Sequence, residues 1–127
     1  MIRNLVWLAL NIFFEARGEC FEGKVAVGHV TMNRVVTRDL SLEDIVKQPW
    51  QFSWMNADQR KKLKIVFQDF ESLIECAEAA MKTLGERLEG KDLWGATHYY
   101  SDSLPEPPYW ADDYPFIVKK GRHNFHK

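Results

Sequence analysis

Apolar residues recur every three or four positions near the start of the chain, at Leu5, Leu8, Ile12 and Ala16. This spacing predicts a helix over 4–17 with one buried face. Gly18 follows directly, as is typical just beyond a helix C-terminus. Glu15 falls on or beside the buried face near the end of this helix, so we expect its carboxyl group to lie away from the solvent face.

Further helices are predicted along the first two thirds of the chain. One runs over 23–38, with Val25, Met32 and Val36 in register and with Ala26 and Gly28 small enough for another helix to approach closely. A short helix opens after Ser41, a typical N-cap residue, and ends at Lys47. A basic helical stretch begins at Gln59. The most amphipathic helix is predicted over 69–85, with these residues facing inward: Leu73, Ala77, Ala80, Met81 and Leu84.

The pattern changes after Gly90. Residues 94–100 show the alternating pattern of a strand and are rich in β-forming types. Residues 104–108 form a proline-rich turn, and residues 116–118 form a second extended run. These features predict a small antiparallel hairpin or sheet. Because 127 residues fit one compact domain, we expect a single domain over 1–127 of the α+β class, mainly helical with this β region in the C-terminal third.

Composition and charge limit the classes of molecule that the protein is expected to bind. The net charge is −1, with 17 basic and 18 acidic residues, so no strong field attracts nucleic acid or an anionic membrane surface. Nothing requires more than a monomer. The two cysteines, Cys20 and Cys76, are too few for a disulfide framework, and we expect both to be free and buried. The apolar N-terminus is interrupted by Asn11 and Glu15 and lacks a cleavage site, so we expect no secretion signal and no membrane span.

Glu15 carries the candidate chemistry. Its neighbours in sequence are apolar, and burial against such groups raises the pKa of a carboxyl, as a general acid for glycoside cleavage requires. A helix-end glutamate paired with Arg17 or Arg34 is the competing interpretation. Periodicity by itself does not decide between the two. Asn11, one turn earlier, either hydrogen-bonds this carboxyl or faces solvent.

Five blocks of sequence, in the same order, carry a resemblance to a known family: 10–19 with 23–27 and 33–35, then 51–54, 95–99, 108–111 and 121–125. They resemble the SleB-type cell-wall hydrolases, which are spore-cortex lytic enzymes and related phage endolysins. The resemblance implies a lysozyme-like α+β fold, cleavage between N-acetylmuramic acid and N-acetylglucosamine, and Glu15 as the catalytic residue. It implies no cofactor. Peptidoglycan glycan strands are the expected substrate.

The reaction type depends on a second carboxylate. A hydrolytic muramidase needs one near the acid, and four candidates are not distinguished by pattern: Glu19, Glu22, Asp112 and Asp113. A lytic transglycosylase needs one glutamate, which closes a 1,6-anhydro ring on muramic acid. Because the resemblance points to a single glutamate, it favours transglycosylation. A non-catalytic peptidoglycan-binding module is the alternative from another class.

Aromatic and amide side chains in the matched blocks are candidates for binding sugar. Gln51 and Ser53 offer hydrogen bonds, and four rings offer stacking faces or ordinary core packing: Phe52, Trp54, Tyr99 and Trp110. We expect one of His98 and His123 to order the hairpin and the other to contact substrate. A zinc amidase would need clustered ligands, but His29, His98, His123 and His126 show no metal-binding spacing, so no metal is expected.

Without a secretion signal, the protein would reach the wall by phage-type release or as part of a trimmed exported protein.

Overall fold

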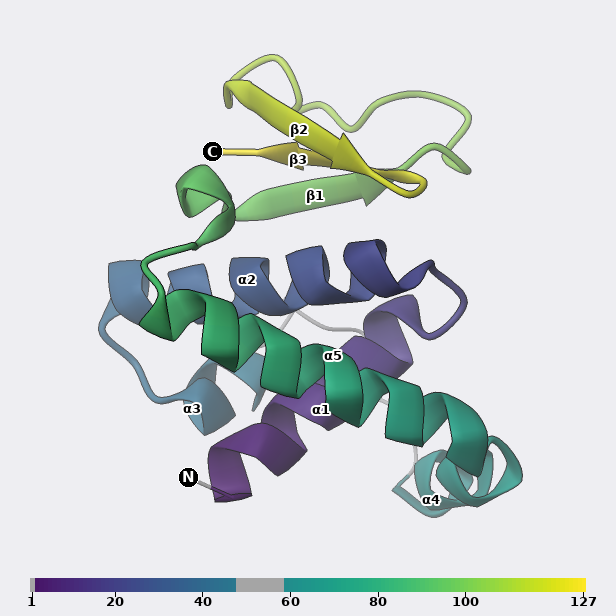
Figure 1. Cartoon of the computed structure of the whole chain (residues 1–127). Helices are drawn as coiled ribbons and strands as arrows, with labels where there is room; N and C mark the ends of the chain where they lie inside the picture. The colour runs from purple at the N-terminus through teal and green to yellow at the C-terminus, as the bar shows by residue number, and fades with distance from the viewer. Residues whose placement is uncertain (1, 48–58) are drawn as a thin grey trace.

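The computed structural model describes residues 2–47 and 59–127, in which a helical layer carries a small sheet on one side (Figure 1). The helices are α1 (Ile2–Ala16), α2 (Phe21–Arg38), α3 (Leu42–Lys47), α4 (Gln59–Gln68) and α5 (Phe70–Leu88). A short turn, η2 (Leu93–Gly95), then leads to the strands β1 (His98–Ser101), β2 (Phe116–Lys120) and β3 (His123–His126). The predicted α+β class is confirmed.

Helix α2 lies between the other helices and the sheet, so it is buried on nearly every side (Figure 1). Residues 23–31 are all buried, and they contribute to two apolar clusters, one shared with α1, α3 and α5 and the other with the sheet. The helix begins at Phe21, two residues before the predicted start. Val36 was expected in the buried register but is 68% exposed, because it lies near the helix end beyond both layers.

The predicted close approach of a second helix at Gly28 is confirmed. A Cβ atom at this position would lie 2.5 Å from Oγ1 of Thr83 on α5. The same Thr83 hydroxyl donates a 3.1 Å hydrogen bond to the carbonyl oxygen of Val25. The α2–α5 contact is therefore tight, and it holds the central helix against the helical layer.

Helix α5 differs from its prediction in two respects. It continues to Leu88, three residues beyond Gly85, and Met81 is 53% exposed although it was expected to face inward. The other predicted inward positions are confirmed, because Ala80 is buried and Leu73, Ala77 and Leu84 pack against the core. Cys76, Ala79 and Thr83 complete the buried face. The start of α3 is confirmed, because Ser41 Oγ accepts a 3.1 Å hydrogen bond from the Asp44 amide.

The sheet has the strand order β1-β3-β2, with both pairs antiparallel. The predicted pairing of the two extended runs is therefore corrected: β3, which the pattern did not reveal, lies between them. Trp94 lies in η2 and not at the start of a strand. The inner face of the sheet, with Tyr99, His123 and Phe125, is directed toward α2 and the end of α1.

The outer face of the sheet carries an aromatic cluster under the long β1–β2 connection. His98 stacks on Tyr114 with ring centroids 4.2 Å apart, and the Trp110 ring lies 5.2 Å from His98 and 5.5 Å from His126. His126 Nδ1 also lies 2.8 Å from the Tyr114 carbonyl oxygen. This cluster folds the connection onto the sheet.

Both cysteines are free. Cys76 is fully buried, and burial raises its pKa to about 11. Cys20 was expected to be buried but is exposed, because it lies in the turn between α1 and α2. Among the helices in the described ranges, none combines the length and apolarity needed to cross a membrane.

Candidate functional site

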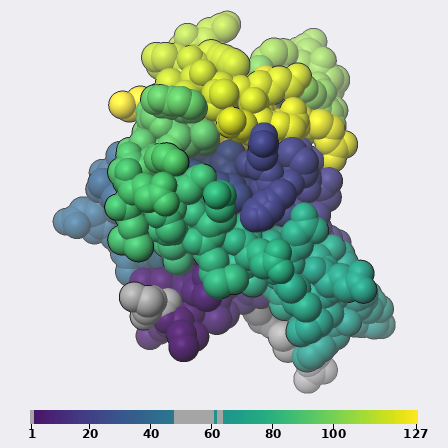
Figure 2. Space-filling view, in the orientation of Figure 1, coloured from purple at the N-terminus to yellow at the C-terminus, as the bar shows by residue number. Residues whose placement is uncertain are grey.

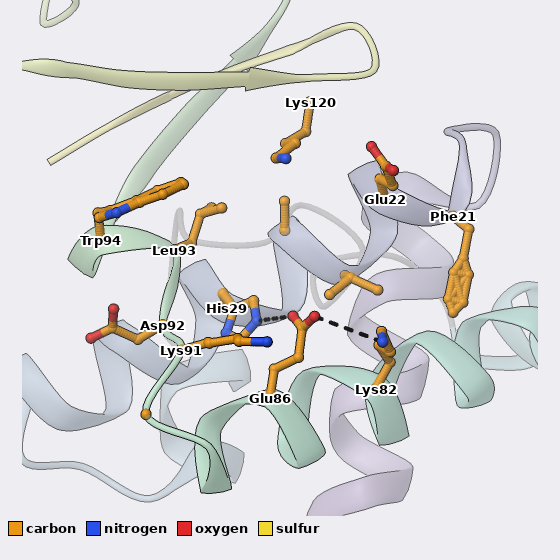
Figure 3. A pocket seen from close by; sticks show the side chains of 13 residues that line it. Phe21, Glu22, His29, Lys82, Glu86, Lys91, Asp92, Leu93, Trp94 and Lys120 are labelled. Atoms are coloured by element: carbon orange, nitrogen blue, oxygen red, sulfur yellow. Dashed lines mark hydrogen bonds and ion pairs between the residues drawn. The ribbon is translucent and has the colours of Figure 1, made fainter.

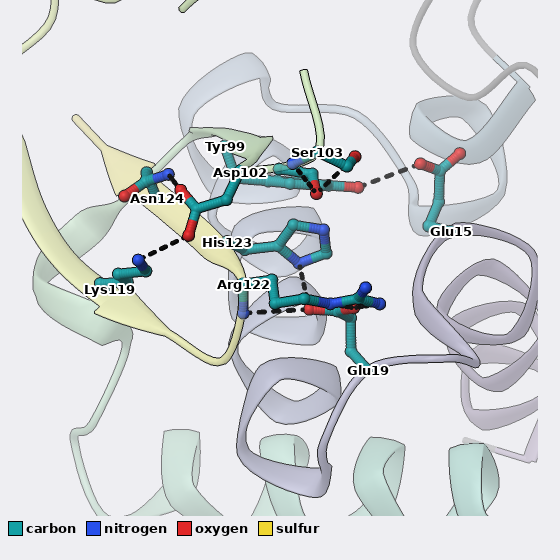
Figure 4. A network of polar contacts seen from close by, with 10 residues as sticks. Glu15, Glu19, Tyr99, Asp102, Ser103, Lys119, Arg122, His123 and Asn124 are labelled. Atoms are coloured by element: carbon teal, nitrogen blue, oxygen red, sulfur yellow. Dashed lines mark hydrogen bonds and ion pairs between the residues drawn. The ribbon is translucent and has the colours of Figure 1, made fainter. Parts of the chain in front are cut away.

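Glu15 lies on the last turn of α1 and faces the inner side of the sheet (Figure 4). The hydroxyl of Tyr99 on β1 donates a 3.1 Å hydrogen bond to Oε2 of this carboxyl. The two residues are 84 positions apart, so the contact joins the helical layer to the sheet. The carboxyl group is thus held in a fixed position by a partner from the opposite layer.

Burial is the largest influence on the Glu15 carboxyl and raises its pKa above the usual value. The Tyr99 hydrogen bond and the positive charge of Arg34 act in the opposite direction but do not cancel it. Arg34 donates from Nε to the Thr97 carbonyl oxygen at 2.8 Å. Arg17, the other arginine considered as a partner for Glu15, lies 3.8 Å from Asp69 instead. Glu15 therefore holds its proton at a higher pH than an exposed glutamate would.

Tyr99 remains a neutral phenol beside this carboxyl. Burial and the nearby Glu15 charge raise its pKa well above the usual value, so the hydroxyl keeps the proton that it donates. Its ring packs on the inner face of the sheet, 5.2 Å from the His123 ring and 5.7 Å from the Phe125 ring. Because Tyr99 donates to Oε2, the other carboxyl oxygen of Glu15 can contact further partners.

A hollow of about 410 Å³ opens beside Glu15, between the end of α1, α4 and the sheet. Its lining combines Glu15 with hydroxyl, imidazole and guanidinium groups from the strands and their turns, including Ser101, Ser103, Arg122 and His123. The Ser103 hydroxyl donates to Ser101 Oγ at 2.9 Å. An acid at the edge of a polar hollow of this size matches what a site for a hydroxyl-rich ligand needs.

Glu19 lies in the same hollow but in a different electrostatic setting (Figure 4). Arg122 donates to it from its backbone amide at 3.2 Å and from its guanidinium group at 2.6 and 3.1 Å. His123 Nδ1 lies 3.8 Å away. Burial raises the pKa of Glu19, but the hydrogen bonds from Arg122 outweigh it and lower the pKa below its usual value. Glu19 is therefore an ionised partner of Arg122.

The structure brings together some of the residues singled out from the sequence and separates others. Glu15 and His123 line the hollow, and Tyr99 contacts Glu15. His98 and Trp110 instead lie in the outer cluster of the sheet. Four candidate residues fall outside the described residues: Gln51, Phe52, Ser53 and Trp54.

Sequence reasoning missed Arg122, Ser101 and Ser103 as lining residues. Of these three residues, Arg122 could have been found most easily from the sequence, because it lies within the matched block 121–125. Asn11 does not face solvent, because it is fully buried and donates a 2.9 Å hydrogen bond to Thr31. In the described part of the chain, no group of three or more His, Cys, Asp or Glu side chains is placed to hold a metal ion.

Residues 18–126 match the family described as cell wall hydrolase. Two solved structures share the fold. The catalytic domain of the germination-specific lytic transglycosylase SleB from Bacillus anthracis is 22% identical, with a TM-score of 0.69 over 100% of this chain and 96% of that one. The catalytic domain of the Bacillus cereus SleB protein is also 22% identical, with a TM-score of 0.67 over 98% and 91%. No curated protein matches the chain significantly. The chain therefore belongs to the cell wall hydrolase family of peptidoglycan-degrading enzymes.

Proposed function

We propose that this protein is a lytic transglycosylase that cuts the bond between N-acetylmuramic acid and N-acetylglucosamine, with Glu15 as its catalytic residue. The observation that carries the proposal is the setting of Glu15: a carboxyl with a raised pKa, oriented by Tyr99 and bordering a polar hollow. The match to the cell wall hydrolase family begins three residues after Glu15, so the role of this residue rests on its geometry. The B. anthracis relative of similar fold is itself described as a lytic transglycosylase.

The reaction requires two proton transfers by one group. Protonated Glu15 first gives its proton to the oxygen that links C1 of muramic acid to the next sugar, and that C1–O bond breaks. The carboxylate then removes the proton from the 6-hydroxyl of the same muramic acid, whose oxygen bonds to C1. The products are a free 4-hydroxyl and a 1,6-anhydro ring, so no water is consumed. Glu15 ends the cycle protonated, as it began.

The state of the second acid favours this route over hydrolysis. Of the carboxylates considered from the sequence, Glu19 shares the hollow with Glu15, whereas Glu22 lines a different one. Glu19 is ionised and accepts three hydrogen bonds from Arg122. A carboxylate stabilised in this way is a weak base for activating water. One free acid with a raised pKa is what transglycosylation needs.

The side chains around Glu15 suit a glycan. Ser101 and Ser103 offer hydroxyl groups, and His123, whose pKa burial lowers, offers a neutral imidazole. These groups bind hydroxyl and N-acetyl groups by hydrogen bonds without requiring a charged ligand. The proposed sugar-binding residues also include His98 and Trp110, which lie in the outer cluster, and the segment 51–54, which lies outside the described residues.

Mass spectrometry of digested peptidoglycan tests the proposal. We expect muramic acid ends that are one water lighter than reducing ends, from vegetative walls or from spore cortex, and no such ends with Glu15→Gln. Reducing muramic acid ends from the native protein would identify a hydrolytic muramidase instead. Wall clearing that persists with Glu15→Gln would exclude Glu15 as the catalytic residue. Binding without clearing by the native protein would identify a non-catalytic module.

A further inference from the structure

A second hollow lies on the other side of the turns that carry Glu19 and Arg122. It encloses about 550 Å³ between α2, α5 and η2. In the space-filling view it opens toward the viewer, between the green segment that follows α5 and the start of α2 (Figure 2). Its volume falls within the roughly 300–1,000 Å³ that is usual for small-ligand sites. Nothing in the proposed reaction at Glu15 uses it.

The wall formed by η2 presents an aromatic ring to this hollow (Figure 3). Trp94 is 66% exposed, which is unusual for so large an apolar side chain. Its backbone is left-handed, with φ 53°, and it stands between Leu93 at 56° and Gly95 at 79°. This region of backbone conformation is strained for any residue other than glycine. The fold therefore holds the ring outward at an energetic cost.

Buried side chains of α2 keep this strained turn in place. Asn33 donates 2.8 Å hydrogen bonds to the carbonyl oxygens of Asp92 and Ala96, one on each side of the turn. Arg87 of α5 in turn donates to the side-chain oxygen of Asn33 at 2.9 Å. Strain that surrounding contacts maintain in this way is typical of functional sites.

The remaining lining is apolar at its floor and polar at its rim. Val25 and Ala26 form part of the floor, and the Phe21 ring stands at the end opposite Trp94 (Figure 3). The carboxylate of Glu86 is positioned by buried His29, whose Nε2 lies 2.9 Å from Oε1, and Nζ of the exposed Lys82 lies 4.0 Å from Oε2. The hollow thus contains a hydrogen-bond acceptor in a fixed position.

The charges at the rim indicate the class of ligand. Three lysines, Lys82, Lys91 and Lys120, face three acids, Glu22, Glu86 and Asp92. Because the signs balance, the hollow favours neither an anion nor a cation. It suits a neutral ligand with apolar faces and many hydroxyl groups, which is the chemistry of a sugar ring.

The two hollows adjoin each other. Glu19 in the α1–α2 turn lines the first hollow, and Phe21 at the start of α2 lines the second. Arg122 in the β2–β3 turn lines the first hollow, and Lys120 at the end of β2 lines the second. The two turns touch, since a Cβ atom at Gly121 would lie 3.0 Å from Cys20 Sγ. A linear polymer that extends from Glu15 across these two turns would reach the second hollow.

We propose that the hollow lined by Trp94 binds uncharged sugar units of a glycan strand, at a distance from the bond that is cut. This inference rests on the proposed function for the identity of the strand. Trp94 and Phe21 supply the stacking faces, Glu86 accepts hydrogen bonds from hydroxyl groups, and Lys91 and Lys120 donate them. The hollow strengthens attachment to long strands.

Binding to the inactive Glu15→Gln protein tests this inference without turnover. The probes are an N-acetylglucosamine tetramer and peptide-free glycan strands, followed by the indole N–H signals in NMR spectra. We expect Trp94→Asn to remove one indole signal that shifts with either probe and to weaken strand binding about tenfold, or ~1.4 kcal/mol. Asparagine tolerates left-handed backbone, so the fold and the thermal midpoint should be retained. Lys120→Gln should weaken binding by a smaller factor.

Tyr109→Asn is the matched control, because Tyr109 is 93% exposed and does not line either hollow. It should leave strand binding unchanged. Equal binding by the Trp94→Asn and parent proteins would overturn the inference, as would a Trp94-dependent response to isolated stem peptides with none to the sugars. Trp94-dependent glycan binding without anhydro products from the native protein would contradict the proposed reaction and leave this site in place. Anhydro products from the native protein, together with strand binding that Trp94→Asn does not change, would support the proposed reaction and overturn this inference.

Discussion

The last turn of α1 and the turn that follows it place two glutamates in one hollow with opposite electrostatic outcomes. Glu15 is half-buried and accepts a hydrogen bond from the neutral Tyr99 hydroxyl, and burial raises its pKa. Glu19 accepts three hydrogen bonds from Arg122, and its pKa is lowered. Four residues of separation are enough to give one acid that keeps its proton and one that stays ionised. Burial decides the protonation of Glu15, whereas the hydrogen bonds from Arg122 decide that of Glu19.

Glu15→Gln is the strongest way to break this comparison. Because an amide cannot donate the catalytic proton and recover it, we expect peptidoglycan cleavage to fall by roughly 10²–10⁴-fold. A buried carboxyl with a raised pKa supplies stability below its unfolded-state pKa and loses it as the pH rises through the folded-state pKa. The variant should therefore unfold at a higher temperature than the native protein above that range. Release of soluble muropeptides and thermal melts at several pH values measure both effects.

If the Glu15→Gln variant kept most of the cleavage activity, the difference in pKa between Glu15 and Glu19 would have no role in catalysis. Glu19→Gln is the matched comparison at the neighbouring acid. We expect it to reduce cleavage far less than Glu15→Gln does.

Tyr99→Phe sharpens the comparison by removing the hydrogen bond from Tyr99 that orients Glu15. Cleavage should fall about tenfold, equivalent to ~1.4 kcal/mol, because the carboxyl is less well positioned. The hydrogen bond lowers the pKa of Glu15, so its loss should raise that pKa further. The basic limb of the profile of kcat/KM against pH should then move to higher pH. A purely structural role for Tyr99 would lower the rate without moving that limb.

Tyr100→Phe is the control for this change. Tyr100 is the next residue on β1 but points to the outer cluster, where its ring lies 5.8 Å from that of Trp110. Its hydroxyl has no place in the proposed reaction. We expect the pH profile of this variant to match that of the native protein.

The burial of Glu15 was predictable from the sequence because it is a local property. Leu8, Ile12 and Ala16 form the buried face predicted from their spacing, and Glu15 lies beside it. The Tyr99 contact was not predictable, since it depends on how the sheet docks against α1 across 84 positions. The sequence also left four carboxylates as equal candidates for a second acid. The structure separates them, because Glu19 shares the hollow with Glu15 and is paired with Arg122, 103 positions away, whereas the other three do not line that hollow.

The errors in the fold have related physical causes. Strand β3 was missed because two of its three buried residues, His123 and His126, are histidines, and histidine does not register as apolar in a pattern. The start of α2 and the inward position of Val36 were wrong because a helix between two layers also buries polar residues, such as Lys24 and Asn33, so that no apolar stripe marks its bounds. Trp94 was assigned to a strand because residues 94–100 are rich in β-forming types. In the structure, hydrogen bonds from Asn33 hold the turn around Trp94 in a left-handed conformation.

Arg122→Ala tests the Glu19 side of the comparison and has the smallest expected effect. The pair joins the α1–α2 turn to the β2–β3 turn, but Arg122 is 65% exposed, so we expect a loss of only about 1 kcal/mol in the free energy of unfolding at neutral pH. A carboxyl with a lowered pKa contributes stability above its unfolded-state value, near 4.3, and loses it as the pH falls through the folded-state value. The difference between native and variant proteins should therefore shrink in acid.

Denaturant titrations at neutral and acidic pH measure this difference. Lys91→Ala is the control, because its 3.2 Å contact with Glu89 joins two largely exposed side chains and should contribute almost nothing at either pH. If Arg122→Ala lost the same stability at both pH values, its contribution would come from packing. Glu19 would then not be the ionised partner that the comparison requires, and it would return as a candidate base for hydrolysis beside Glu15.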